Sequence, residues 1–438
     1  MTKPPELLTN TKRQIKPHRF LSIGTMSGSS MDGIDAAVIK TDGQNYAHHI
    51  AGSGLRFSPA FQLALRIAEF AVQQENGDTS SVNKNFSRYI QDYINNLSID
   101  QKLTDKLKHE FGLPALSKLT LPLVIEKFTK FHALLIRDLL NKAKLDSTDI
   151  EVIGFHGQNL YHHPDVSITI QVGDGQLLAD LTGITVINNF RANDVKHGGQ
   201  GAPFAPLYHQ VLARQKGLYP LAIVNCGGIA NITIISGDNP DQIIGFDTGP
   251  GNVLIDRYVR LKTQNREMMD EDGKYGGKGK VDDEIILLLK KQALANYGGD
   301  FFAKPPPKSL DSSHFQLPEA LMDLSINDGC TNLAAFTALS IVESLELVKS
   351  SAPNMWILAG GGWKNPVISG FFRQYLHTKL GNRIKILSAD EYGLNSQYME
   401  AEIFAYLAAR SLLKLPISFP GTTGVKIPMI GGDTANPK

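Results

Sequence analysis

Cysteine is scarce in this sequence of 438 residues, which has only Cys226 and Cys330. Neither belongs to a CxxC pair, so the sequence predicts no zinc site and no disulfide framework, and it fits a reducing compartment. Long apolar runs are also missing. No stretch approaches the 18 uninterrupted apolar residues that would predict a membrane span.

An excess of charge is absent as well, because 44 basic residues are balanced by 43 acidic ones. This balance argues against a polyanion-binding surface, so we expect no nucleic-acid partner. The first 20 residues are polar and lack the apolar core of a secretory signal. We therefore expect a cytoplasmic protein without membrane association, with residues 1–17 as a loose extension.

What is present is enough apolar sequence for two folded domains. Hydrophobic residues make up 42% of the chain, which is normal for a globular protein. In the first half we expect strands at 19–28, 32–43 and 46–58, then helices at 59–73 and 121–144. Strands at 150–158, 167–173 and 183–190 and a short helix at 175–182 follow. Residues 76–120 are polar and read as an irregular insertion.

The second half opens in the same way as the first. Strands are expected at 219–228, 229–236 and 242–247, followed by helices, a buried strand in "MWILAGGGWKNP" and a last helix at 396–414. The repeat is one of architecture rather than of letters. It predicts an α/β protein with two similar lobes, residues 1–188 with 418–438 and residues 189–417, and a ligand cleft between them.

Three glycine turns fall at predicted strand ends. "GTMSGSSMDGID" (24–35) joins the first two strands, "NCGGIAN" (225–231) stands at the equivalent place in the second half, and "LAGGGWKN" (358–365) follows a buried strand. Glycine lets backbone N–H groups approach an anion, and serine hydroxyls add donors. Such turns suit nucleotide phosphates, and Asp32 or Asp35 could hold Mg²⁺ through water. Any one of them alone is as well explained as an ordinary hairpin.

The two commonest nucleotide motifs are absent. "GKYGGKGKV" (273–281) lacks the GxxxxGK[ST] spacing, and no GxGxxG fingerprint occurs. A nucleotide site would therefore be of the two-lobed kind, which clamps phosphates between paired hairpins.

A single acid stands in "GFDTGPGN" (245–252). Asp247 follows the apolar run "QIIGF" and precedes "GPG", so we expect it at the end of a strand, locked by a sharp turn. A fixed carboxylate suits a general base. The alternative is a turn former or the N-cap of the following helix.

Two further segments carry candidate binding residues. In "GFHGQNLYHHP", His156 and Gln158 follow a strand without the spacing of a zinc site, so His156 would donate a hydrogen bond to a substrate or order a loop. In "NFRANDVKHGGQGAP", Arg191 offers a planar fork for a carboxylate or phosphate. A solvated connector is the alternative there, and Asp194 and Lys196 have no assigned role.

Taken together, seven motifs resemble those of the anhydro-N-acetylmuramic acid kinases in order and rough spacing, from about residue 20 to the C-terminus. They are "MSGSSMDGID", "GFHGQ", "GGQGAP", "NCGGIAN", "GFDTGPGN", "GGG..NP" and "MEAE". The resemblance implies two ribonuclease-H-like lobes of the actin, hexokinase and heat-shock-chaperone ATPase fold around a nucleotide cleft. One departure is "NFRAND" where the family often has "DFRRRD", so Asn189 replaces an acid. The N-terminal tail and the 76–120 stretch also look longer than usual.

The resemblance also implies an activity and its residues. These enzymes use ATP, Mg²⁺ and water to open the ring of 1,6-anhydro-N-acetylmuramic acid and phosphorylate its 6-oxygen, in cell-wall recycling. Asp247 would be the catalytic base, and we expect a homodimer whose partners are a small-molecule sugar substrate and ATP. ATP would contact Gly28, Ser29, Ser30, Met31, Asp32, Gly33, Ile34, Asp35, Gly227, Gly228, Gly360, Gly361 and Gly362. Substrate would contact His156, Gln158, Arg191, Asn252 and Glu400.

Rival functions exist within the same fold. A conventional hexose or amino-sugar kinase would place its base beside a free hydroxyl and bind no water at the anomeric carbon. A non-catalytic sugar sensor would usually add a DNA-binding domain, and no helix-turn-helix with a basic face is evident. A chaperone would need a substrate-binding domain, for which residues 415–438 are too short. Glu400 is also nearly as well explained as a surface residue of the last helix.

Overall fold

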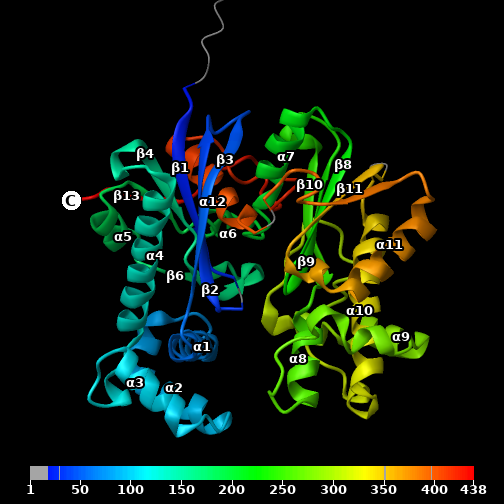
Figure 1. Cartoon of the computed structure of the whole chain (residues 1–438), viewed down its shortest axis with the longest axis horizontal. Coiled ribbons are helices and arrows are strands. Elements are labelled where there is room, and N and C mark those ends of the chain that lie inside the picture. The colour runs from blue at the N-terminus through cyan, green and yellow to red at the C-terminus, as the bar shows by residue number, and fades with distance from the viewer. Residues whose placement is uncertain (1–17, 29, 350–351, 396) are drawn as a thin grey trace, which may run out of the picture.

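The computed structural model describes residues 18–438 apart from 29, 350–351 and 396 (Figure 1). The expected loose extension at 1–17 and the candidate ATP contact Ser29 lie outside these described residues. Within them, no helix is both long enough and apolar enough to cross a bilayer.

The first sheet has six strands in the order β13-β7-β4-β1-β2-β3. β2 is antiparallel to both β1 and β3, whereas β4 is parallel to both β1 and β7. Strand β13 pairs antiparallel with β7 at the edge. The strands are β1 (Phe20–Met26), β2 (Gly33–Thr41), β3 (Ala47–Arg56), β4 (Ile150–Phe155), β7 (Val186–Asn188) and β13 (Asp433–Ala435).

The second sheet has five strands in the order β10-β9-β8-β11-β12. β9 is antiparallel to both β8 and β10, and β11 is parallel to both β8 and β12. The strands are β8 (Leu221–Cys226), β9 (Ile229–Ile235), β10 (Ile243–Pro250), β11 (Met355–Ala359) and β12 (Lys385–Ser388). Without β13, the two sheets share order and direction strand for strand. The predicted fold class, two ribonuclease-H-like α/β lobes, is confirmed by this topology.

The helices of the first half are α1 (Pro59–Gln74), α2 (Thr79–Asn96), α3 (Gln101–Glu110), α4 (Leu121–Ala143), α5 (Gly175–Thr182) and α6 (Ala192–Lys196). Of these, α4 and α5 pack on the first sheet, whereas α1, α2 and α3 pack on one another below it (Figure 1). The expectation of an irregular insertion at 76–120 was wrong. Asp78 and Asp100 cap α2 and α3. Four residues of α2 (Val82, Phe86, Tyr89 and Ile90) form a buried stripe at helical spacing within a polar sequence.

Helices of the second half pack on the second sheet, with α10 and α11 on one face and α7 on the other. These elements are α7 (Ala205–Lys216), α8 (Val253–Lys262), α9 (Asp283–Gln292), α10 (Ile326–Glu343) and α11 (Pro366–Leu380). Helix α8 begins directly after the "GPGN" turn, as expected.

The last helix, α12 (Met399–Leu412), packs on the first sheet although it comes from the end of the chain. Two glycines permit this close approach. A Cβ on Gly24 would lie 2.0 Å from the carbonyl oxygen of Ala401, and one on Gly154 would lie 2.1 Å from that of Phe404. By packing, α12 therefore belongs with the first lobe, whereas the predicted boundary places it in the second. The boundaries at 188/189 and 417/418 stay a prediction.

One apolar cluster joins the two sheets. It contains Val152 and Ile187 from the first sheet, Ile223 and Ile357 from the second, and residues of α7 and α12 between them. Burial of this shared core holds the two lobes together.

A small hairpin, β5 (Gln158–His163) with β6 (Ile168–Val172), lies beside the main sheets. The second of these strands was expected and the first was not. The residues of β5 are polar, so their alternation in burial is hard to recognise from sequence.

Candidate active site

Asp247 lies within β10 and not at its end, because the strand continues to Pro250. Asp247 faces Asn231 on β9 and Gly249 faces Ala230, so Thr248 is an extra residue that forms a bulge. Bulges re-aim side chains next to functional sites. The predicted sharp turn is therefore a bulge inside the strand, and Asp247 is fixed just before it.

The carboxylate of Asp247 is buried, with 6% of the residue exposed. Its Oδ2 accepts a hydrogen bond from the backbone N–H of Leu310 at 2.7 Å, and its own N–H donates to the carbonyl of Lys308 at 3.0 Å. Burial raises the pKa of Asp247 to about 7, although the Leu310 N–H and the charges of Arg191 and Lys308 oppose this. A carboxyl group poised near neutrality can exchange a proton efficiently at physiological pH.

Arg191 is the central cation of the site. Its Nη1 donates to the carbonyl of Gly201 at 2.7 Å, and Nη2 donates to Nε2 of His156 at 3.2 Å. Its Nε is buried and has no hydrogen-bond partner among the described residues. Asp247, Asp194, Asp311 and Glu400 are the acids whose charges act on Arg191. An orphaned buried donor surrounded by acids is suited to a substrate oxygen.

His156 orients Arg191. Its Nδ1 bonds the carbonyl of Gly157 at 2.8 Å, which makes Nδ1 the donor and leaves Nε2 free to accept from Arg191. Burial and the charge of Arg191 hold the pKa of His156 well below its usual range, so the ring is neutral. Both ring nitrogens are occupied, which supports the ordering role weighed for this residue more than a direct substrate contact.

The loop that carries Arg191 is held from within. Asp194 accepts a hydrogen bond from the N–H of Gly201 at 2.6 Å, and the carbonyl of Gly201 is the acceptor for Arg191. Asp194 is thus a structural residue of the loop. Asn189 donates to Asp433 of β13 at 2.8 Å, so the residue that replaces the family's usual acid ties the loop to the sheet edge.

Glu400 and Asp35 bring the two lobes together at the site. Glu400 stands in the first turn of α12 and bonds the side chain of Asn225 at the end of β8. Its side chain is reached by solvent, yet surrounding protein raises the pKa of Glu400, and the nearby charge of Asp35 raises it further. Burial also raises the pKa of Asp35. Glu400 therefore lies where α12 meets the end of β8, and its role in binding stays a prediction.

The first glycine turn lies between β1 and β2. Gly28 leaves open space, since a Cβ there would meet only the Ser30 hydroxyl at 3.7 Å. Arg66 of α1 donates to the carbonyl of Ser30 at 2.7 Å. Three candidate ATP contacts here, Met31, Gly33 and Ile34, are buried. Gly33 is required by the sheet, because a Cβ there would lie 2.4 Å from the carbonyl of Leu55.

The second and third glycine turns lie against each other. A Cβ on Gly360 or Gly362 would lie within 2.8 Å of the Cys226 carbonyl, so these two glycines let the turns meet. Gly227 and Gly361, in contrast, have room for a Cβ. Glycines whose added Cβ would clash with the protein are needed for packing, whereas those with open space can let a ligand approach the backbone. Gly28, Gly227 and Gly361 fit this description best.

Gln158 and Asn252 lie beside the turns. The Oε1 of Gln158 accepts from the hydroxyl of Ser27 at 2.6 Å, and its Nε2 donates to the carbonyl of Gly28 at 3.4 Å. Gln158 therefore braces the first turn. Asn252 precedes α8 and donates its backbone N–H to the carbonyl of Gly227 at 2.8 Å. A sugar contact for either residue stays a prediction.

A magnesium ion would have to be held mainly by nucleotide phosphates. The described residues contain no group of three or more His, Cys, Asp and Glu side chains that could bind a metal alone. Asp32 is engaged by the hydroxyl of Ser30 at 2.5 Å and by an ion pair with Arg56. Asp35, whose carboxyl lies near Glu400, is the better candidate for a water-mediated contact, since a cation would relieve this proximity.

Sequence reasoning missed the segment 308–310 and Asn225. The segment holds Asp247 from the open edge of β10, yet it lies more than 60 positions further along the chain. The only signal was a lysine in a proline-rich run, "PPPKS". Asn225 is a polar residue at the end of an apolar strand, which is a weak sign of a site.

Comparisons with known proteins give one family. A family model described as anhydro-N-acetylmuramic acid kinase matches residues 115–436. A protein of that name from Methylobacterium nodulans is 35% identical over 417 residues, covering 95% of this chain and all of its own. Another, from Rhizobium johnstonii, is 37% identical and covers 95% of this chain and 98% of its own. Among solved structures, a ROK family glucokinase from Streptomyces griseus in complex with glucose and AMPPNP is 11% identical with a TM-score of 0.35, covering 89% of this chain and 99% of its own.

Proposed function

The chain belongs to the anhydro-N-acetylmuramic acid kinase family and is an ATP-dependent sugar kinase, and from this we propose that it converts 1,6-anhydro-N-acetylmuramic acid, ATP and water to N-acetylmuramic acid 6-phosphate and ADP. One active site would open the anhydro ring and phosphorylate the 6-oxygen. The reaction would return a cell-wall sugar to metabolism.

The observation that carries this proposal is the state of Asp247. The carboxyl is buried, its Oδ2 is bound by the Leu310 N–H, and its pKa is raised to about 7. A base that activates water must be both fixed and able to take a proton near neutral pH. A cap or turn former needs neither property.

In the first half of the reaction, Asp247 would remove a proton from a water molecule as its oxygen attacks the anomeric carbon. The bond between that carbon and the 6-oxygen breaks, and its electron pair stays on the oxygen. Arg191 would stabilise negative charge on the freed oxygen, because its charge acts on Asp247 and its buried Nε–H has no hydrogen-bond partner among the described residues.

In the second half, the freed 6-oxygen would attack the γ-phosphorus in line and displace ADP. A phosphate could approach the backbone closely at Gly28 and Gly227, because a Cβ added at either position would meet no atom closer than 3.7 Å, although the Gly227 N–H already donates to the carbonyl of Ile229. Bound Mg²⁺ would neutralise part of the phosphate charge. Glu400 and Asp35 lie where the two lobes meet and would order the ligands there.

The rival function is a conventional sugar kinase that uses a free sugar hydroxyl. Its base would deprotonate that hydroxyl, and no water would attack carbon. The expected homodimer, the cytoplasmic location and the absence of a nucleic-acid partner stay predictions.

One experiment separates the two functions. The protein is incubated with ATP, Mg²⁺ and either anhydro or free N-acetylmuramic acid, and the product is identified by mass. In oxygen-18 water, we expect label at the anomeric hydroxyl of a phosphorylated product from the anhydro sugar. Phosphorylation of the free sugar alone would support the conventional kinase and overturn the proposal.

A further inference from the structure

The open edge of β10 is held by a short segment, residues 308–310, which we name the strap. β10 is the last strand of its sheet, so only its other edge pairs with a strand, β9. At Asp247 the strap replaces the missing neighbour. It accepts the backbone N–H through the carbonyl of Lys308 and binds the carboxylate through the N–H of Leu310.

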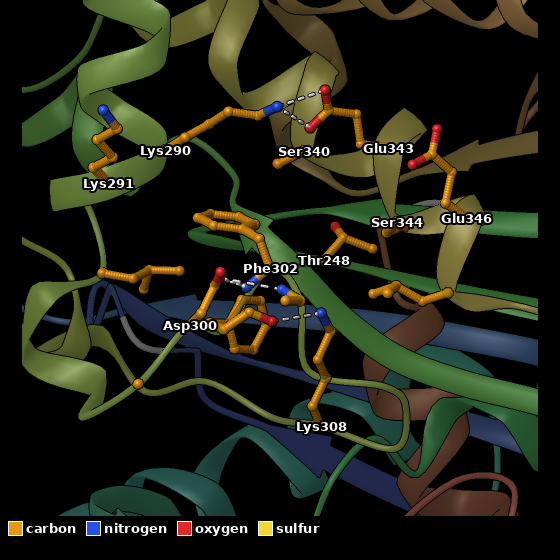
Figure 2. A pocket seen from close by; sticks show the side chains of 15 residues that line it. Thr248, Lys290, Lys291, Asp300, Phe302, Lys308, Ser340, Glu343, Ser344 and Glu346 are labelled. Atoms are coloured by element: carbon orange, nitrogen blue, oxygen red, sulfur yellow. Dashed lines mark hydrogen bonds and ion pairs between the residues drawn. The ribbon is translucent and has the colours of Figure 1, made fainter.

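The side chain of Lys308 points away from the cleft into a cavity of about 650 Å³ behind β10. Figure 2 shows Lys308 near Thr248, with Lys290 paired to Glu343 further along the wall. Thr248 follows Asp247 directly, so β10 separates the cavity from the carboxylate.

Lys308 is a buried cation, only 1% exposed. Its Nζ donates to the carbonyl of Phe301 at 2.8 Å and lies 4.2 Å from the ring centre of Phe301. No carboxylate among the described residues lies within ion-pair distance of it. An ammonium has three donors, and burying one without a paired acid costs several kcal/mol. The unfavourable burial of Lys308 therefore indicates a role that offsets its cost.

The charges around Lys308 and Asp247 identify the reason for a lysine at this position. Asp247, then Asp300, are the acids that favour the charged form of Lys308, while burial and Lys304 oppose it and bring the pKa of Lys308 to about 8. The cations that act on Asp247 are Arg191 from the cleft side and Lys308 from the cavity side. The base thus lies between two positive charges.

We propose that Lys308 is a positioning residue for Asp247: it anchors the strap and keeps a positive charge behind the carboxylate. The proposal rests on the proposed role of Asp247 as the base. When sugar binding excludes water from the cleft, the rear charge keeps the carboxylate ionised, because a nearby cation favours the charged form of an acid.

The test compares Lys308→Met, which removes the charge and keeps the chain length, with Lys308→Arg, which keeps the charge. The control is Lys291→Met, an exposed lysine on the same cavity. In Lys308→Met we expect the acid limb of the kcat/KM profile to move up by about one pH unit, the size typical of an opposite charge nearby. Activity would then be about tenfold below the parent at pH 6 and within about twofold at pH 9. The other two variants should keep the parent profile.

A second readout does not depend on the sugar. With aspartate labelled at the carboxyl carbon, the NMR signal that Asp247→Asn removes reports the titration of Asp247, and Lys308→Met should move it upward. An equal loss of activity at every pH, or an unmoved NMR titration, would overturn the proposal and leave Lys308 a packing residue. A shifted titration without turnover of the anhydro sugar would instead count against the proposed function. If Lys308→Met does not fold by circular dichroism, Lys308→Gln replaces it with the same expectation, because its amide can still donate to Phe301.

Discussion

The turn between β1 and β2 and the turn between β8 and β9 occupy the same place in their sheets, yet different bonds hold them. In the first turn, Arg66 binds the Ser30 carbonyl and Arg56 pairs with Asp32, and this pair is largely exposed. In the second turn, the carbonyls of Gly227 and Gly228 accept the backbone N–H groups of residues 251–253. Backbone bonds to another segment fix the second turn, whereas the first is tied to its surroundings mainly by side chains, among them an exposed ion pair, so we expect it to be the more adjustable turn.

The third strands differ as well. β10 carries Asp247, while its counterpart β3 has no carboxylate in "AHHIAGSGLR". We therefore expect the two lobes to differ in role: the second lobe holds Asp247, the proposed base, within a strand, and the first lobe supplies a turn that can adapt to a ligand. The following predictions test this division.

Asp247→Asn should have the largest effect. The amide keeps an oxygen for the Leu310 N–H but cannot take a proton, so turnover should fall about 10²–10⁴-fold. The matched control in the first lobe is Asp42→Asn, because Asp42 is a buried acid whose Oδ1 accepts three backbone N–H groups in a turn. That variant should lose thermal stability while its folded fraction turns over normally. If Asp247→Asn turns over within a few-fold of the parent, the second lobe does not supply the base through Asp247, and the proposed difference between the lobes is refuted.

The pH dependence should show the same base. Since the pKa of Asp247 is about 7 and the base must be ionised, kcat/KM should fall about tenfold per pH unit below that value. Rates over pH 5–9 check this, with Asp247→Asn as the variant that should lose this limb. A flat profile down to pH 5 would contradict it.

The same group should also affect stability, with a definite sign. The folded pKa of Asp247, about 7, lies above the unfolded value of about 3.9, so the folded protein keeps a proton that the unfolded chain releases between these values. The contribution of the protonated Asp247 carboxyl to stability is present below about pH 4 and is lost as the pH rises toward 7. Asp247→Asn should therefore melt higher than the parent at pH 8. A lower melting temperature there would favour the cap or turn role.

Valine at the two open glycines compares the turns directly. A Cβ fits at both Gly28 and Gly227 in the free protein, so the folds should survive. The methyl groups would block close approach of a phosphate at either place, and loss of one polar phosphate contact predicts about a tenfold rise in KM for ATP. Gly227→Val should be the more severe because its turn cannot shift. Gly370→Ala, at an open site on α11, is the control, and equal effects at the two turns would remove the distinction between them.

Arg66→Ala should give the smallest effect. It frees the Ser30 carbonyl and removes a partly exposed ion pair with Glu69, whose contribution to stability is about 0–1 kcal/mol. We expect the melting temperature to stay close to that of the parent and KM for ATP to rise only a few-fold. Unchanged ATP kinetics would mean that Arg66 does not control the first turn. The second turn offers no equivalent variant, since backbone groups hold it.

Much of the scaffold could be predicted from the sequence because its signals are local. Apolar runs that end in glycine marked the first two strands of each sheet, and the repeat of this pattern gave the two lobes. The helix at 79–96 was missed because four buried residues carry its apolar face within a polar sequence. The position of Asp247 inside β10 was missed because a bulge follows from pairing with β9 and leaves no mark on the segment itself.

The candidate site was predictable only in part. Single residues such as Arg191 and Asp247 could be identified from chemistry and neighbouring motifs. Their bonds could not, because Leu310 lies 63 positions from Asp247 along the chain and His156 lies 35 positions from Arg191. The division between glycines that serve packing, such as Gly24, and those that face open space, such as Gly28, also requires the position of α12.

Helix α12 and strand β13 have a consequence for biosynthesis. They are translated after every strand they contact, although they cover β1, β2 and β4 and complete the edge at β7. Until they emerge, the first sheet has its other strands but lacks this helix on one face, and apolar residues such as Val152 and Ile187 lack the partners that it provides. The first lobe therefore cannot complete its packing until residue 435 has left the exit tunnel, whereas all five strands of the second sheet are available once β12 has emerged. A chain truncated before residue 399 would keep the strands of the later lobe and would lack the last helix and the edge strand of the earlier one.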